Sequence, residues 1–203
     1  MRPRSTELAL LLAVFLDMVG FTMLIPNIQL RAETLLQGSP LVGPTIGLLL
    51  QSTFIVQLFA SPRWGKWADA TGRKKVFILC QWLSALAMLI YGFADVVWLL
   101  FVSRIIAGFG GANVSVAQAM AAAHAGDARK KQVMGWMSGI LSAGMIFGPG
   151  LGGLVGHQFG AAGLGITGAL ISFIGGIVVM VFVPNDEHRE VAAEPTKPDR
   201  KWF

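Results

Sequence analysis

The chain has 203 residues, of which 54% are hydrophobic and 13% are charged, and its formal net charge at pH 7 is +5. Soluble domains carry about 25% charged residues. This composition, with a mean hydropathy of +0.64, therefore predicts a membrane protein and argues against an ordinary soluble domain. The single cysteine, Cys80, lies inside an apolar run, which excludes an internal disulfide and predicts a packed thiol.

Six apolar stretches are each long enough to cross a bilayer as a helix, which takes about 20 residues. Helices are expected because lipid offers an exposed backbone amide no hydrogen-bond partner. The predicted spans lie near residues 8–30, 41–61, 76–94, 97–121, 133–155 and 161–183. They predict an all-α membrane bundle over residues 1–183, with a polar, proline-containing tail over residues 184–203.

The basic residues gather in alternate loops. If the six spans alternate in direction, all but two of the 16 Lys and Arg residues fall on one side of the membrane. The exceptions are Arg31, on the opposite side, and Arg104, within a span. Cytoplasmic loops carry such an excess, so we expect both termini to be cytoplasmic and the chain to be a multi-pass protein of the cell (inner or plasma) membrane. The positive charge then serves topology, and no nucleic-acid partner is expected.

Two loop patterns of similar spacing lie 88 residues apart in the chain. Residues 65–72 follow the pattern G-x-x-x-D-x-x-G, and residues 153–160 follow G-x-x-x-H-x-x-G. The same offset relates Gly-Phe at 20–21 to Gly-Phe at 108–109. Because an odd number of spans separates the two loops, they lie on opposite sides of the membrane, and the pattern predicts two inverted three-helix repeats.

Four motifs resemble signatures of the major facilitator superfamily. The loop between spans two and three carries Gly65, Asp69, Gly72, Arg73 and Lys74 in the order of that family's signature loop. Span four contains R-x-x-x-G-x-G-G from residue 104, which is similar to the family's fourth-helix motif. Span one has L-D-x-x-G from residue 16, as in the twelve-helix drug:proton antiporter branch. Span five follows the antiporter-type pattern G-x8-G-x3-G-P-x2-G-G through Gly135, Gly144, Gly148, Pro149, Gly152 and Gly153.

The resemblance covers the N-terminal six-helix half of such a transporter. It implies one bundle of a major-facilitator fold, working in secondary active transport by alternating access, and not an enzyme. It further implies proton-coupled export of small amphipathic molecules, with H+ as the coupling ion and no other cofactor. The expected partners are the lipid bilayer, a small-molecule substrate, and either a missing C-terminal six-helix half or a second copy.

Asp17 and Arg104 are the leading candidates for proton coupling. A carboxylate about ten residues into a span costs on the order of 2.5–3.5 kcal/mol to insert and usually faces a cavity or a partner. The resemblance places a coupling acid in this helix. Arg104 stays charged, so inside a span it is expected to bind carbonyls or a carboxylate; the alternative is an arginine that snorkels to the membrane surface.

Three amides are candidates for the substrate cavity: Asn27, Gln51 and Asn113. For each of them, and for Gln81 in span three, an interhelical hydrogen bond is the alternative interpretation. No metal site is expected, since the histidines lack companion ligands.

The charged loop and the glycines of span five each have a structural and a functional interpretation. By resemblance, the loop from Gly65 to Lys74 is a latch whose charges bind neighbouring helix ends in one transport state; the alternative is a simple positive anchor. The span-five glycines form small-x-x-x-small rows that let another helix approach, and Pro149 removes a backbone hydrogen bond and can kink the helix. A hinge at Pro149 is compatible with such packing.

Other functional classes have weaker support. An intramembrane serine protease would need a buried serine with a histidine base, yet GWMSG at residues 135–139 misses the G-x-S-G spacing by one residue. A water channel would need paired N-P-A loops, which the sequence lacks. The remaining alternative is a half-bundle without transport activity of its own.

Overall fold

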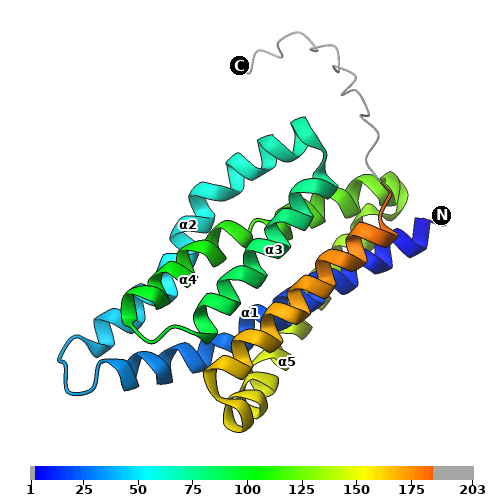
Figure 1. Cartoon of the computed structure of the whole chain (residues 1–203). Helices are drawn as coiled ribbons and strands as arrows, with labels where there is room; N and C mark the ends of the chain where they lie inside the picture. The colour runs from blue at the N-terminus through cyan, green and yellow to red at the C-terminus, as the bar shows by residue number, and fades with distance from the viewer. Residues whose placement is uncertain (1–2, 185–203) are drawn as a thin grey trace, which may run out of the picture.

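A computed structural model describes residues 3–184, apart from the side chains at positions 3, 4, 126 and 127; most of the predicted tail lies outside these residues. The described chain consists of helices joined by short turns (Figure 1). Backbone hydrogen bonding divides it into five helices: α1 (Pro3–Leu35), α2 (Val42–Thr71), α3 (Arg73–Gly92), α4 (Val97–Gly110) and α5 (Asn113–Phe182). Five stretches of the described residues are long and apolar enough to cross a membrane.

The last helix, α5, covers what the sequence predicts as the end of span four and all of spans five and six. A straight helix of 70 residues would be about 105 Å long. Gly144 and Ser172 of α5 nevertheless both contact the same short stretch of α1. The helix therefore folds back on itself, and Figure 1 shows the hairpin in yellow. Gly160, with a φ of +63°, lies at this reversal, where a residue without a Cβ is favoured.

The predicted fourth span is not one continuous helix. Residues 111 and 112 form a turn between α4 and α5. The reason is local: a Cβ on Gly110 would lie 2.9 Å from the backbone nitrogen of Ser84, and one on Gly111 would lie 3.0 Å from the Gln57 side chain. Two glycines let α3 and α2 approach here, while Gly111 and Ala112 keep right-handed φ and ψ, so Val97–Ala125 still runs as one apolar stretch through the turn. Helix α1 extends beyond the predicted span 8–30 at both ends, and α2 continues ten residues past the predicted end at residue 61, because polar residues continue both helices beyond the apolar segment.

The predicted repeat is supported by the turns. Gly72 between α2 and α3 has a φ of +103°, and Gly160, 88 residues later and within α5, also has a positive φ. Contacts agree with this: α1 packs on the part of α5 that includes Gly144, and α4 packs on α2. The first helix of each repeat thus packs on the second helix of the other.

Two clusters of buried apolar side chains form the core, one towards each end of the bundle. The first contains Leu10, Phe77, Met120 and Val179; the second contains Ile28, Tyr91, Leu100 and Leu164. We call the end with the first cluster the basic end, because it carries Arg63, Lys66, Arg73, Lys74, Lys75, Arg129, Lys130 and Lys131. At the opposite end Arg31 donates to the carbonyl of Ala94 (Nε to O 2.9 Å) and pairs with Asp95 (3.4 Å).

Candidate functional site

Asp17 lies in the middle of α1 and is the centre of a buried polar cluster. Its residue surface is 6% exposed. Asn113 Nδ2, at the start of α5, donates to Asp17 Oδ2 at 2.6 Å, and Ser172 Oγ, near the end of α5, donates to Oδ1 at 3.2 Å. Both predicted residues, Asp17 and Asn113, are therefore brought together, and Ser172 completes the pair of carboxylate contacts.

The cluster extends into α3 through Gln81. The Asn113 Nδ2 group also donates to Gln81 Oε1 at 2.8 Å, and Gln81 Nε2 donates to the carbonyl of Ala13 at 3.4 Å. The Gln81 side chain is fully buried. This chain of contacts joins α1, α3 and both ends of α5. Among the described residues, no basic side chain lies within 4.0 Å of the Asp17 carboxylate, so its neighbours in the cluster are neutral.

Arg104, in α4, lies apart from this cluster. It is 2% exposed, so it does not snorkel to the membrane surface. Its guanidinium sits over the ring of Tyr91, 5.8 Å from the centroid, which is cation–π geometry. Its Nε donates to Ser103 Oγ at 3.4 Å, while Nη2 has no hydrogen-bond partner among the described residues. Arg104 therefore faces the interior, as expected. The expected carbonyl or carboxylate acceptor for its guanidinium is not found among the described residues.

The other two candidate amides, Asn27 and Gln51, lie in different parts of the bundle. Asn27 Nδ2 donates to the carbonyl of Gly152 at 3.3 Å and to that of Met23 at 3.2 Å. It is an interhelical contact between α1 and α5. Gln51, on α2, is exposed on the surface of the bundle. Neither amide joins the Asp17 cluster.

Three glycines of the antiporter-type motif form a flat surface against α1. A Cβ on Gly144 would lie 2.7 Å from the Met18 side chain, and one on Gly148 or Gly152 would overlap Thr22 or the backbone of Met23. Thr22 Oγ1 donates to the carbonyl of Gly144 at 2.9 Å across the same surface. The packing interpretation holds for these three glycines.

The remaining positions of the motif face elsewhere. A Cβ on Gly135 or Gly153 would meet open space, so neither is needed for close approach. Pro149 lies inside α5 without ending it. A hinge at Pro149 stays a prediction.

The charged loop is tied to a neighbouring helix. Arg73 Nη2 pairs with Asp69 Oδ1 at 3.0 Å, and Arg73 Nη1 donates to the carbonyl of Ala119 in α5 at 3.2 Å. Gly72 provides the positive φ of the turn. Gly65 has open space around it, and no contact of Lys74 contributes to the tie. The loop thus holds a helix end through Arg73 and Asp69.

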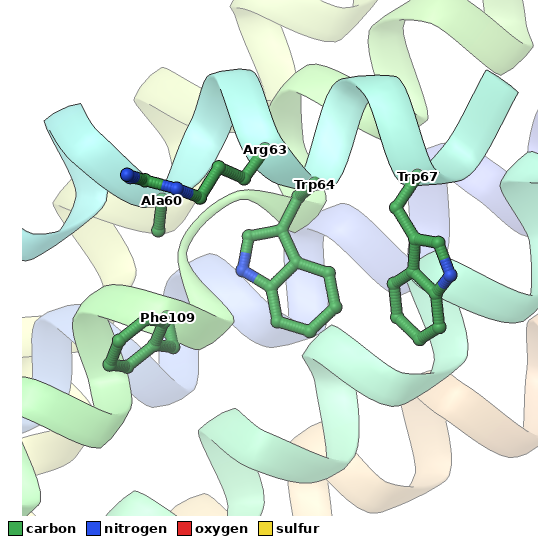
Figure 2. Close-up of a pocket in the computed structure, with 5 residues that line it drawn as sticks. All are labelled: Ala60, Arg63, Trp64, Trp67 and Phe109. Atoms are coloured by element: carbon green, nitrogen blue, oxygen red, sulfur yellow. The ribbon is translucent and has the colours of Figure 1, made fainter. Parts of the chain in front are cut away.

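An aromatic hollow of about 340 Å³ lies beside this loop, between α2 and α4 (Figure 2). The Trp64 and Trp67 rings line it with centroids 5.2 Å apart, and Phe109 faces them from α4. Arg63 turns its guanidinium away from the two indoles and donates to the carbonyl of Phe59 at 2.9 Å. The hollow is therefore mainly aromatic, and Arg63, although it also lines the hollow, directs its guanidinium away from the indoles.

Sequence reasoning did not single out Ser172 or the pair formed by Glu7 and Arg129. The two guanidinium Nη atoms bind the two Glu7 oxygens at 3.1 and 2.9 Å. A serine in an apolar span gives no periodic signal. For Glu7 a signal exists: it is an acid at the edge of the first span, with Arg129 as a basic residue at the same predicted side of the membrane.

Comparisons with known proteins agree with this fold. The family model described as Major Facilitator Superfamily matches residues 10–202. The class G tetracycline resistance protein of Vibrio anguillarum is 29% identical over 185 residues, covering 91% of this chain and 47% of that protein. Multidrug resistance protein 2 of Bacillus subtilis is 32% identical over 164 residues, or 80% of this chain and 38% of that protein.

A solved structure shares the fold. The crystal structure of the human organic anion transporter MFSD10 (TETRAN) aligns with a TM-score of 0.81 at 22% identity, covering 91% of this chain and 48% of that one. The chain spans about half the length, or less, of the proteins that it matches.

Proposed function

The chain belongs to the major facilitator superfamily, a family of membrane transporters rather than enzymes, and from that membership we propose that it forms one six-span lobe of a proton-coupled exporter of small amphipathic molecules. Curated relatives are named for tetracycline and multidrug resistance, which supports export as the direction. The basic end is then cytoplasmic, with both termini on that side of the cell membrane.

Asp17 is the proposed proton site, and its set of neutral partners carries the proposal. A buried carboxylate paired with a cation would stay ionised, whereas one held by an amide and a hydroxyl can take a proton without leaving a buried cation unpaired. Asn113 and Ser172 are such partners. The Ser172 hydroxyl and the flexible amide network can adjust to either protonation state.

Arg104 is proposed as the second coupling residue. Its unpartnered Nη2 group needs an acceptor, because a buried guanidinium without a full set of acceptors is costly. We propose that an acceptor reaches it in another transport state, from the substrate or from a second lobe. The loop held by Asp69 and Arg73 is proposed as the conformational latch, since the exposed pair between these residues supports a single part-buried hydrogen bond to the Ala119 carbonyl, which can be released.

A second lobe is part of the proposal. Alternating access in this family places the substrate between two lobes. The α2 helix buries few of its residues in this chain and exposes Phe54, Leu58 and Phe59. We propose that a second six-span bundle, either a C-terminal half or another copy of this chain, covers this apolar face.

The test measures proton movement in vesicles containing the full chain. An external tetracycline pulse, with a pH-sensitive dye in the lumen, is expected to give substrate-dependent proton flux that Asp17→Asn abolishes. Asp95→Asn is the matched control, because the Asp95 side chain is 93% exposed at the opposite end. Equal flux from Asp17→Asn and the unchanged chain would remove Asp17 from coupling.

The partner question has its own measurement. Single-molecule counting of labelled chains in the same vesicles is expected to show pairs wherever flux is found. Flux from isolated single chains would contradict the second lobe, and pairs without flux would favour a half-bundle that has no activity of its own.

A further inference from the structure

A hollow of about 530 Å³ lies between α1 and α5 at the basic end, separate from the Asp17 cluster. Its lining combines one ion pair with a row of apolar side chains: Glu7, Arg129, Leu8, Leu12, Phe15 and Trp136. Neither charged residue takes part in the proposed proton route, and the pair lies more than two helical turns from Asp17 along α1. The hollow therefore has no role in the mechanism proposed above.

The ion pair leaves one partner available. The Glu7 side chain is 6% exposed, whereas the Arg129 side chain is 40% exposed. A guanidinium has five N–H donors, and the pair with Glu7 uses one on each Nη atom. Arg129 thus has donors left, on a side chain that the buried carboxylate holds in a fixed position. A ligand that reaches the hollow meets a fixed guanidinium, and an anionic group is its natural partner.

The charge around the hollow favours the same sign of ligand. Lys130 and Lys131 follow Arg129 directly and are exposed. Glu7 is the single acidic side chain among the described residues that line the hollow, and it is already neutralised. Each Lys or Arg near a membrane surface contributes about 1 kcal/mol to the attraction of anionic lipid.

The rest of the hollow suits a hydrocarbon chain. Leu8 and Trp136 are 65% and 61% exposed, so the apolar wall opens outward from the bundle. The ion pair lies near the starts of two stretches long and apolar enough to span a membrane, Ser5–Leu35 and Ala128–Phe182, which places it at the depth of lipid headgroups. A tryptophan beside basic residues is typical of that depth.

We propose that this hollow is a binding site for an anionic phospholipid of the leaflet at the basic end. The phosphate lies against Arg129, with Lys130 and Lys131 nearby, and an acyl chain lies along Leu8, Leu12 and Trp136. The aromatic hollow beside α2 lacks this combination, because Arg63 is directed away from it. Lipid occupancy would fix the start of α1 against α5 independently of any transported substrate.

The experiment uses the full chain in phosphatidylcholine nanodiscs doped with brominated lipid, which quenches tryptophan on contact. Quenching that disappears in Trp136→Phe is assigned to Trp136. We expect brominated phosphatidylglycerol to half-saturate this signal at a mole fraction about five-fold lower than brominated phosphatidylcholine does, since 1 kcal/mol corresponds to about that ratio. Equal mole fractions for the two lipids would overturn the proposal.

Three variants separate a lipid site from a structural ion pair. Arg129→Gln is expected to remove the phosphatidylglycerol preference, whereas Lys130→Gln, the exposed neighbour, is expected to keep most of it. Glu7→Gln keeps an oxygen that can accept from Arg129 and so hold it in place, but it removes the competing negative charge, and it is expected to strengthen the preference. If Glu7→Gln weakened it as much as Arg129→Gln does, the effect would come from loss of the ion pair, and the lipid site would be refuted.

A last measurement tests whether the bound anion is a bilayer phospholipid or a diffusible amphiphile. Decyl phosphate is added to nanodiscs that contain brominated phosphatidylglycerol. Complete recovery of Trp136 fluorescence at micromolar decyl phosphate would show a site for a diffusible amphiphile and would overturn the lipid assignment. Persistent quenching supports it. These measurements use no transport assay, so their outcome is independent of the proposed export function.

Discussion

The contact between α1 and residues 144–156 of α5 and the contact between α4 and α2 occupy equivalent places in the two repeats, and they are built in the same way. In the first, three glycines lie flat against α1, and Thr22 and Asn27 donate to α5 carbonyls. In the second, Gly108 approaches α2, and the side chains of Thr53 and Gln57 donate to carbonyls of residues 104 and 111. Both contacts use the same devices.

The difference lies in what surrounds each contact. Of the most apolar window of α1, 61% is buried, against 11% for α2. Helix α1 contacts α5 at several separate stretches of that helix, whereas α2 contacts chiefly α4. Two helices at equivalent places in the repeats therefore differ in how closely the rest of the chain packs around them, so a clash should be harder to relieve at α1 than at α2.

The largest effect is expected from Gly152→Ala in the first contact. The added Cβ would overlap the carbonyl of Met23, which is backbone of an enclosed helix and cannot move aside. Overpacking of this kind costs about 3 kcal/mol, measured as a fall in the thermal midpoint in detergent. Gly150→Ala, which meets open space, is the control and should gain up to about 1 kcal/mol from helix propensity. Equal midpoints would show that α1 yields as easily as α2.

The next largest effect on stability is expected at the ion pair between Glu7 and Arg129, where removal of either partner should have a different cost. Arg129→Ala leaves the Glu7 carboxylate buried and unpaired, at a cost of about 2 kcal/mol. Glu7→Ala leaves a guanidinium that is 40% exposed and can hydrate, so about 1 kcal/mol is expected. Denaturant titration of both variants checks the order. The reverse order would mean that Glu7 is better hydrated than its 6% exposure indicates.

A smaller loss is expected from Gly108→Ala in the second contact. The new Cβ would lie 2.6 Å from the Thr53 carbonyl oxygen, a clash of the same kind as at Gly152. Because α2 is open on its other side, it can shift, and we expect about 1 kcal/mol. Gly47→Ala, in open space on α2, is its control. A loss equal to that of Gly152→Ala would end the distinction between the two contacts.

The smallest effect on stability is expected from Asp69→Asn in the loop that joins α2 to α3. The pair with Arg73 is exposed at 35% and 62% of the side chains, so its loss should cost less than about 0.5 kcal/mol. If the loop is a latch, this variant should still raise the labelling rate of a cysteine placed at Ala119. Unchanged labelling would favour a simple anchor.

The residues that could be identified from the sequence are those with a local cause. Apolar runs must be helices in lipid, so the spans were predictable, and the charged loop stood out because it interrupts them. The positive-φ turns at Gly72 and Gly160 were marked by the repeated loop pattern. The packing role of Gly144, Gly148 and Gly152 followed from their four-residue spacing, which places them on one helix face.

Other features had no local cause. Asp17 was recognisable as a buried acid, yet its partner Ser172 lies 155 residues away. Three further features depend on which helix faces are turned towards each other. They are the separation of Arg104 from Asp17, the exposure of Gln51 and the turn at residues 111–112. The continuity of α5 was also not predictable, because helical hydrogen bonding persists through most of a reversal that hydropathy divides into separate spans.

By itself the sequence indicated a multi-pass helical membrane protein of this family, because hydropathy, charge asymmetry and glycine spacing act over a few residues at a time. The tertiary structure alone decided which polar groups meet: Asp17 with Asn113 and Ser172, and Glu7 with Arg129. The physical reason is that a hydrogen bond between helices depends on their relative rotation and depth, which are set by packing along the whole length of the bundle.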